Sequence, residues 1–190
     1  MDTVIESLLN EGYQARREHR LADAKRAYTE AVDLCRASND QAHLAQSLTR
    51  LGGIERDLHE IDLSLAHYQE AADIYRRLND PLSLAHTIRH VGDILRESGQ
   101  IEPALPCYEE ALRIYRNDRE TGSLDLANTL RGFALLQTQR EKIAEAIELW
   151  KEAGALYNQV WQEPGSPYKE ADLTPGILES REQIALLSSR

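Results

Sequence analysis

A fixed internal period is the feature that most constrains this chain. An aromatic residue recurs at steps of 40, 40 and 42 residues, and an alanine follows it three residues later in every copy. The aromatic positions are Tyr28, Tyr68, Tyr108 and Trp150, and the alanines are Ala31, Ala71, Ala111 and Ala153. Several positions that stay in step over four copies indicate a repeat architecture, in which each unit buries its apolar side against its neighbours.

Each repeat has the apolar spacing of two helices. In the third repeat, apolar residues between 84 and 95 follow one helical face, and those between 101 and 115 follow a second. Gly99 lies between the two faces and predicts a helix stop. A small residue recurs on the first helix, which predicts that the aromatic of the second helix packs closely against its backbone. These small residues are Gly12, Gly52, Gly92 and Ala134.

The period ends after the fourth repeat. We expect repeats at 3–38, 41–79, 81–118 and 123–160, within a single domain of residues 1–190. Pro164, Gly165 and Pro167 then predict a linker over 161–173. A final helix is expected over 174–188, with Thr174 as its N-cap and Pro175 in its first turn. Such a helix would cap the end of the repeat array.

Three segments carry a resemblance to a known family. They are "LGGIERD", "VGDILRESGQIEPALPCYEEAL" and "EKIAEAIELWKEA", which hold the small, turn, alanine and aromatic positions in order. Over roughly residues 3 to 160 the chain resembles the tetratricopeptide repeat (TPR) family, in the longer-helix variant found in kinesin light chains and bacterial regulators. One departure is that Glu55 and Gln137 stand at the position of Leu95 in the third repeat.

The resemblance implies a fold and a function. The implied fold is an all-α, right-handed α-α superhelix, a solenoid of four helix-turn-helix repeats with a C-terminal capping helix. The first helices of the repeats would line a concave surface, and the second helices would lie outside. The implied function is that of a non-catalytic protein-interaction module, adaptor or scaffold.

Composition narrows the range of partners. The formal net charge of -10 argues against a general nucleic-acid binder, because such proteins present a basic face to phosphate. The apolar runs are too short to span a bilayer, and the first residues lack the features of a signal peptide. Two cysteines make no disulfide framework. We therefore expect a soluble, cytoplasmic protein with a protein or peptide partner and no nucleic-acid or membrane partner.

No group of residues predicts catalysis. His86, His90 and Asp93 lie within two helical turns of one another, but a single helical face offers poor geometry for three metal ligands and no fourth ligand is evident. Cys35 stands at an apolar position, which favours packing over reactivity. The chain has no recognisable catalytic triad or phosphate-binding glycine loop. We expect no enzyme activity, no metal and no cofactor.

Arginines recur on the expected inner face of the first helices. Arg16, Arg56 and Arg96 are 40 residues apart, while Arg89 and Arg131 share another position with Arg50 beside it. Guanidinium groups in a cleft attract carboxylates and bind them through two parallel hydrogen bonds. The hypothesis is a groove for an extended, acidic peptide segment. Its predicted residues are Tyr13, Arg16, Arg17, Gln46, Arg50, Arg56, His86, Arg89, His90, Asp93, Arg96, Asn128 and Arg131, and Thr49 and Gly53 share the same face.

Alternatives remain at the level of residues and of function. The arginines could instead pair with neighbouring acids such as Asp57, Asp93 and Glu97, and contribute little. The protein could be a self-associating structural scaffold, with a homodimer as its simplest form. It could also be a ligand- or peptide-sensing regulatory subunit. The positions that bind chaperone tails in part of the TPR family do not hold the expected residues here, so that ligand is not implied.

Overall fold

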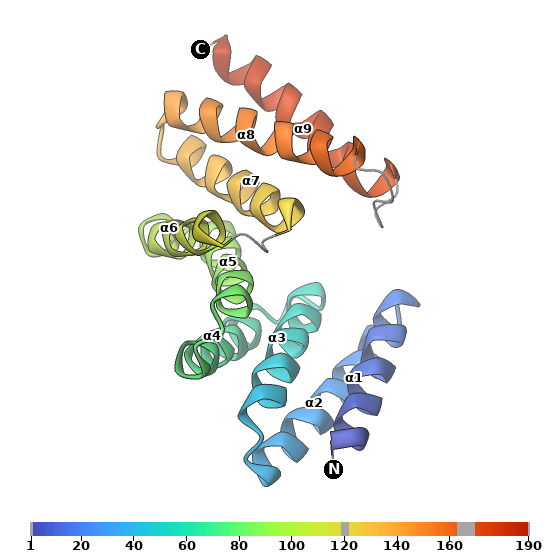
Figure 1. Cartoon of the computed structure of the whole chain (residues 1–190). Coiled ribbons are helices and arrows are strands. Elements are labelled where there is room, and N and C mark those ends of the chain that lie inside the picture. The colour runs from blue at the N-terminus through green and yellow to red at the C-terminus, as the bar shows by residue number, and fades with distance from the viewer. Residues whose placement is uncertain (1, 119–121, 163–169, 190) are drawn as a thin grey trace. The chain divides into compact units, whose positions relative to one another are not determined.

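The fold is entirely helical over the part of the chain that can be described. The computed structural model describes residues 2–118, 122–162 and 170–189. Within these ranges there are helices and no strands (Figure 1). The helices are α1 (Asp2–Arg17), α2 (Leu21–Ser38), α3 (Gln41–Asp57), α4 (Ile61–Leu78), α5 (Pro81–Glu97), α6 (Ile101–Asn117), α7 (Ser123–Gln139), α8 (Ile143–Gln162) and α9 (Glu170–Ser188).

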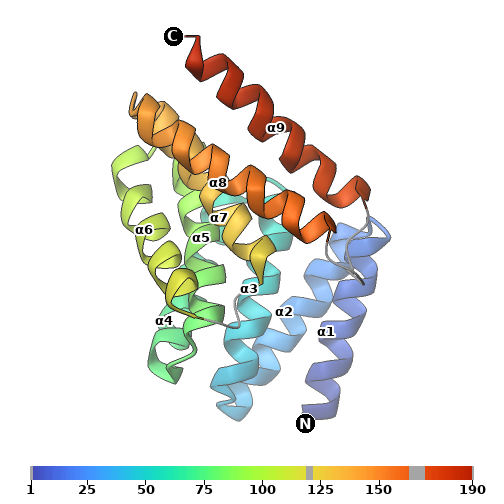
Figure 2. The ribbon, with the colours of Figure 1, turned by 45° about the horizontal axis from the view of Figure 1, so that its top comes forward.

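The helices belong to two compact units, Met1–Ile94 and Leu95–Arg190, which are described separately. In the first unit α1 packs on α2, α2 on α3, and α3 on α4, and α1 also contacts α3. In the second unit α6 packs on α7, α7 on α8, and α8 on α9, with α8 and α9 side by side in both views (Figure 2). Consecutive helices that pack in this way form an α-solenoid, which confirms the predicted fold class.

The recurring aromatic residues lie in the core, as their spacing predicts. Tyr28, Tyr68, Tyr108 and Trp150 are at most 3% exposed. A Cβ atom added at Gly12 would lie 2.5 Å from the Tyr28 ring, and one at Gly52 would lie 3.0 Å from the Tyr68 ring. The absence of a side chain at these positions therefore lets each aromatic ring lie directly on the backbone of the first helix.

The turn inside each hairpin has one left-handed residue. These residues are His19, His59, Gly99 and Glu141, with φ between 58° and 76°. In the second repeat the His59 N–H donates to the Arg56 carbonyl at 3.0 Å, and the Glu60 N–H donates to the Glu55 carbonyl at 2.8 Å. The predicted helix stop at Gly99 is confirmed. The other three turns have the same backbone without a glycine, because the carbonyls at the helix end fix it.

The polar residues at the position of Leu95 are satisfied inside the hairpins. Glu55 is 1% exposed, and its Oε2 lies 2.7 Å from Nδ1 of His67 on α4. Gln137 donates from its side-chain amide to Glu145 at 2.6 Å. Since a buried polar group is tolerated where it has a hydrogen-bond partner, these two departures are compatible with the repeat.

The last helix begins earlier than predicted. Residues 163–169 of the expected linker lie outside the described ranges, and α9 starts at Glu170, so Thr174 is not its N-cap and Pro175 lies inside the helix. Leu173 is 1% exposed and packs in one cluster with Ile177 and with Tyr157 of α8. The local start signal was wrong because burial of Leu173 on α8 keeps the residues before Thr174 in the helix.

Candidate functional site

A hollow of about 340 Å³ lies in the first unit, over side chains from α1, α3, α4 and α5. Six of the predicted groove residues line it: Arg16, Gln46, Arg50, Arg56, His86 and His90. Thr49, Gly53 and Asp57 of α3 also line it, together with Tyr68 and Tyr75 of α4. The two tyrosines were predicted as core residues only. Their position in the repeat gave no sign that they would also line the hollow.

A second hollow adjoins the first and shares two of its residues, Gln46 and Arg50. Its other lining residues are Glu6, Leu9, Asn10, Tyr13 and His43. Tyr13 is 45% exposed, and the Arg17 guanidinium lies 5.8 Å from the centre of its ring. The first unit therefore offers two neighbouring recesses, the first rich in arginine and the second with an exposed aromatic ring.

Several inner arginines are paired with acids of the same unit. Nη2 of Arg16 lies 2.8 Å from Oδ2 of Asp57, and Nη1 of Arg56 lies 3.9 Å from Oδ2 of Asp93. Arg89 is 8% exposed and donates to Asp93 at 3.0 Å. Arg89 is therefore paired with an acid inside the protein, which is the alternative to a ligand-binding role. It does not line either hollow.

Arg50 differs from these arginines. The Nε atoms of Arg50 and Arg89 are both buried without a hydrogen-bond partner. Unlike the other three arginines, Arg50 is recorded in no ion pair with a carboxylate among the described residues, and it lines both hollows. Its guanidinium lies near Tyr28: burial raises the pKa of the Tyr28 phenol, and the charge of Arg50 partly offsets that rise. An unpartnered buried donor costs about 1–3 kcal/mol, so Arg50, which lines both hollows, would gain from a bound acceptor.

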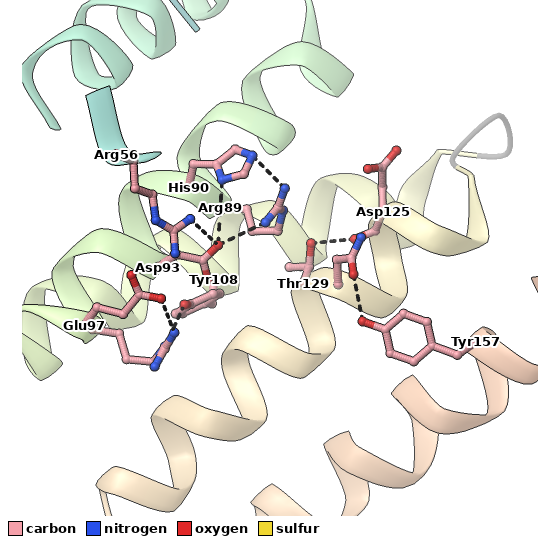
Figure 3. Close-up of polar contacts among 11 residues, drawn as sticks. Arg56, Arg89, His90, Asp93, Glu97, Tyr108, Asp125, Thr129 and Tyr157 are labelled. Atoms are coloured by element: carbon pink, nitrogen blue, oxygen red, sulfur yellow. Dashed lines mark hydrogen bonds and ion pairs between the residues drawn. The ribbon is translucent and has the colours of Figure 1, made fainter. Parts of the chain in front are cut away.

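His90, one of the residues that line the hollow, is held as a neutral imidazole (Figure 3). Arg89 Nη2 and His90 Nε2 are 2.8 Å apart, and because guanidinium only donates, Nε2 is the acceptor. The ring stacks on Tyr68, with centroids 5.1 Å apart, and lies 4.8 Å from the His86 ring. Burial, and next the neighbouring charge of Arg89, lowers the pKa of His90 well below its usual value. His90 adds no positive charge at neutral pH.

Gly53 and Tyr68 shape the bottom of the first hollow. A Cβ atom at Gly53 would lie 3.3 Å from the Tyr68 hydroxyl oxygen and 3.5 Å from Nη1 of Arg16. Burial raises the pKa of Tyr68 to about 12, so its hydroxyl keeps its proton at neutral pH. The side chains of Arg16 and Tyr68 therefore reach the part of α3 that has no side chain of its own.

The predicted groove residues of the second unit are engaged within that unit. Arg96 donates to the Tyr108 hydroxyl at 3.3 Å and to Glu97 at 3.0 Å. The other two predicted groove residues, Asn128 and Arg131, lie on α7 and are bound by side chains of the helices that follow. The Tyr157 hydroxyl donates to Asn128 at 2.7 Å, and Arg131 donates to both carboxylate oxygens of Glu179, at 2.5 Å and 3.1 Å.

Two further observations concern the described residues alone. They contain no group of three His, Cys, Asp or Glu side chains that could hold a metal ion. His86, His90 and Asp93 do not form such a group; His90 is engaged by Arg89 and Tyr68. Within the same ranges, no helix has both the length and the apolar character needed to cross a bilayer.

Comparison with known proteins gives a family match and two similar folds. A family model for the tetratricopeptide repeat matches residues 43–117 and again residues 83–159. No curated protein matches the chain. BtubC (BKLC) from P. vanneervenii has a similar structure, with a TM-score of 0.64 at 15% identity over 99% of this chain and 87% of that chain. The MamA protein gives a TM-score of 0.67 at 14% identity over 100% of this chain and 83% of that chain. At these identities the likeness shows the fold alone.

Proposed function

Because the chain belongs to the tetratricopeptide repeat family, whose domains generally bind protein partners without catalysis, we propose that it binds an extended acidic peptide segment on the inner side of its first unit. The peptide lies across the two adjoining hollows that share Gln46 and Arg50. The single observation that carries this proposal is the buried, unpartnered Nε of Arg50 at the place where the hollows meet.

The charge of the first hollow supports an acidic ligand. Three arginines and one aspartate line it, in a chain whose formal net charge is -10. A recess lined with one sign of charge concentrates groups of the opposite sign, even on a protein with the other net charge. A peptide carboxylate also accepts the hydrogen bond that Arg50 lacks, and charge-assisted bonds of this kind are roughly twice as strong as neutral ones.

The second hollow supports an extended segment. Asn10 and Gln46 carry amide groups, which both donate to and accept from a peptide backbone. Tyr13 offers an exposed ring beside them, with Arg17 over its face. Residues that follow the acidic one along the peptide would lie here. Because Arg96, Asn128 and Arg131 are engaged within the second unit, we assign them no direct contact with this ligand.

Fluorescence anisotropy of short labelled peptides tests the proposal. One peptide alternates glutamate and alanine, and its control has glutamine at every glutamate. We expect the glutamate peptide alone to bind, more weakly as salt is added. Arg50→Glu should weaken binding at least about tenfold, which is 1.4 kcal/mol. Arg77→Glu is the matched control, because Arg77 is an exposed arginine on α4 outside both hollows. Equal binding of the two peptides, or no effect of Arg50→Glu, would refute the proposal.

Self-association is a second candidate function, favoured by α9. Leu178 and Leu186 lie two turns apart on this helix and are 48% and 50% exposed. Large apolar side chains that share a helix face are a common basis for contact between copies. Sedimentation velocity over a range of concentrations distinguishes the two functions. A dimer that the double substitution Leu178→Ser, Leu186→Ser abolishes would support self-association, and a monomer at all concentrations would exclude it.

A further inference from the structure

We infer that the first hollow is a site for a phosphate monoester, carried by a phosphorylated residue of the bound peptide. The inference rests on the proposed function and names the ligand group that the hollow takes. It follows from the arrangement of three arginines around Gly53, from the charge of the lining and from the hydrogen-bonding character of the groups that meet there.

The arginines surround a part of α3 that has no side chain. Arg50 and Arg56 lie three residues before and three residues after Gly53, so all three positions share one side of the helix. Arg16 reaches the same place from α1, with Nη1 only 3.5 Å from where a Gly53 Cβ would be. Glycine is unfavourable inside a helix by roughly 1 kcal/mol relative to alanine. Its presence here lets the Arg16 guanidinium and the Tyr68 hydroxyl lie directly against the backbone of α3.

The charge of the lining matches a dianion better than a carboxylate. Arg16, Arg50 and Arg56 stand against Asp57, a surplus of two positive charges among the residues that line the hollow. Asp93 does not line it, but it lies 3.0 Å from Arg89 and 3.9 Å from Arg56. Counting Asp93 together with its main partner Arg89 leaves the surplus at two. A carboxylate supplies one negative charge, whereas a phosphate monoester carries about -1.5 to -2 at neutral pH.

Two polar groups of the lining side chains have a proton to donate. The Arg50 Nε–H is buried without a partner, and the Tyr68 hydroxyl lies beside Gly53 with its proton retained. A phosphate monoester offers three acceptor oxygens in different directions, while a carboxylate offers two in one plane. Donors that approach from α1, α3 and α4 are therefore matched by phosphate oxygens, and a single carboxylate would leave some of them unpaired.

The test compares three labelled peptides with the same alternating glutamate and alanine flanks and a different central residue. The central residue is phosphoserine, glutamate or serine, and anisotropy gives the three dissociation constants. We expect the phosphoserine peptide to bind at least about tenfold more tightly than the glutamate peptide. In NMR spectra, the Arg50 Nε–H signal should shift further with phosphoserine, because it gains a charge-assisted hydrogen bond.

Two variants locate the effect. Arg50→Gln should remove the preference for phosphoserine over glutamate, and Arg77→Gln, on an exposed arginine outside the hollow, should keep it. Gly53→Ala should also remove the preference, because its methyl group would lie 3.3 Å from the Tyr68 hydroxyl. Alanine favours the helix, so this variant is expected to stay folded, which circular dichroism checks.

The outcomes separate this inference from the proposed function. If phosphoserine and glutamate peptides bind equally and Arg50→Gln weakens both, the phosphate site is refuted and the acidic-peptide function stands. If no peptide binds, both are refuted. If inorganic phosphate at the same concentration displaces the phosphoserine peptide completely, the hollow is a site for small phosphate ions, and its assignment to a phosphorylated peptide is overturned.

Discussion

The two units differ in the extent to which the arginines of their first helices are bound by acids. In the first unit, arginines from α1 and α3 line an open hollow, and Arg50 has a buried donor without a partner. In the second unit, Arg131 stands at the repeat position of Arg89 and is bound by both carboxylate oxygens of Glu179 on α9. Asn128 likewise accepts from Tyr157. The repeat places arginines on the first helices, and the contacts of the folded unit decide which of them are paired with an acid.

The final helix explains part of this difference. Glycine at two positions brings α8 and α9 close: a Cβ atom at Gly176 would lie 2.8 Å from the Tyr157 ring, and one at Gly154 would lie 3.1 Å from Ser180. Glu179 follows Gly176 by three residues and reaches Arg131 from this position. The final helix therefore does more than cover an apolar end, because it also supplies the carboxylate that pairs with Arg131.

The largest expected effect tests whether the two units share one type of core. Tyr28→Ala in the first unit and Trp150→Ala in the second should each lower the free energy of unfolding by about 3–5 kcal/mol, as large aromatic-to-alanine changes in cores do. Chemical denaturation measures both. Trp161→Ala, on the same helix as Trp150 but 46% exposed, is the control and should change stability by less than about 0.5 kcal/mol. A large difference between Tyr28→Ala and Trp150→Ala would show that the cores are not equivalent.

The second prediction concerns the arginine that is buried in the first unit. Arg89→Ala should destabilise the protein by about 3 kcal/mol, because it leaves the buried Asp93 carboxylate without its main partner. The double variant Arg89→Met, Asp93→Leu removes both charges and should recover most of that loss. Denaturation curves of the two variants decide the point. A single variant as stable as the parent would mean that Arg89 is available for ligands after all.

The third prediction concerns the pH dependence of stability that His90 causes. All six histidines of the chain, His90 among them, lie in the first unit. The pKa of His90 is lowered in the folded state, so at acidic pH the unfolded chain takes up a proton at this position before the folded chain does. Stability from His90 is complete above its unfolded pKa of about 6.5 and is lost as the pH falls below it, by at most about 1.4 kcal/mol per pH unit.

His90→Gln isolates this contribution, since glutamine keeps an acceptor for Arg89 but does not titrate. Unfolding free energies of the parent and the variant, measured at intervals between about pH 7.5 and about pH 5.5, should converge as the pH falls. Parallel curves for the two proteins would contradict a neutral, buried His90.

The smallest expected effect is at the contact that occupies Arg131. The side chains of Arg131 and Glu179 are 41% and 29% exposed, so solvent screens the pair. Glu179→Gln should therefore cost no more than about 1 kcal/mol of stability. A loss of several kcal/mol would mean that the pair is essential to the docking of α9.

Part of the candidate site followed from sequence position alone. The side chains at i−3 and i+3 from Gly53 had to share its side of α3, and six predicted groove residues line one hollow. What position could not give is partnership. Arg89 and Arg131 share one position of the repeat and Arg50 stands beside it, yet Arg50 lines the hollow, Arg89 is buried on Asp93 and Arg131 is bound by Glu179. Each partner lies at a different separation along the chain.

The sequence by itself determined the helical hairpins, the aromatic core and the side of each first helix that carries arginine. These follow from the 3.6-residue period and from small residues spaced to receive aromatic rings, which are local properties repeated along the chain. Only the tertiary structure decided where α9 begins, which arginines are engaged and where the hollow lies. These depend on side chains from separate helices that compete for one charged group, and no local pattern records the result of that competition.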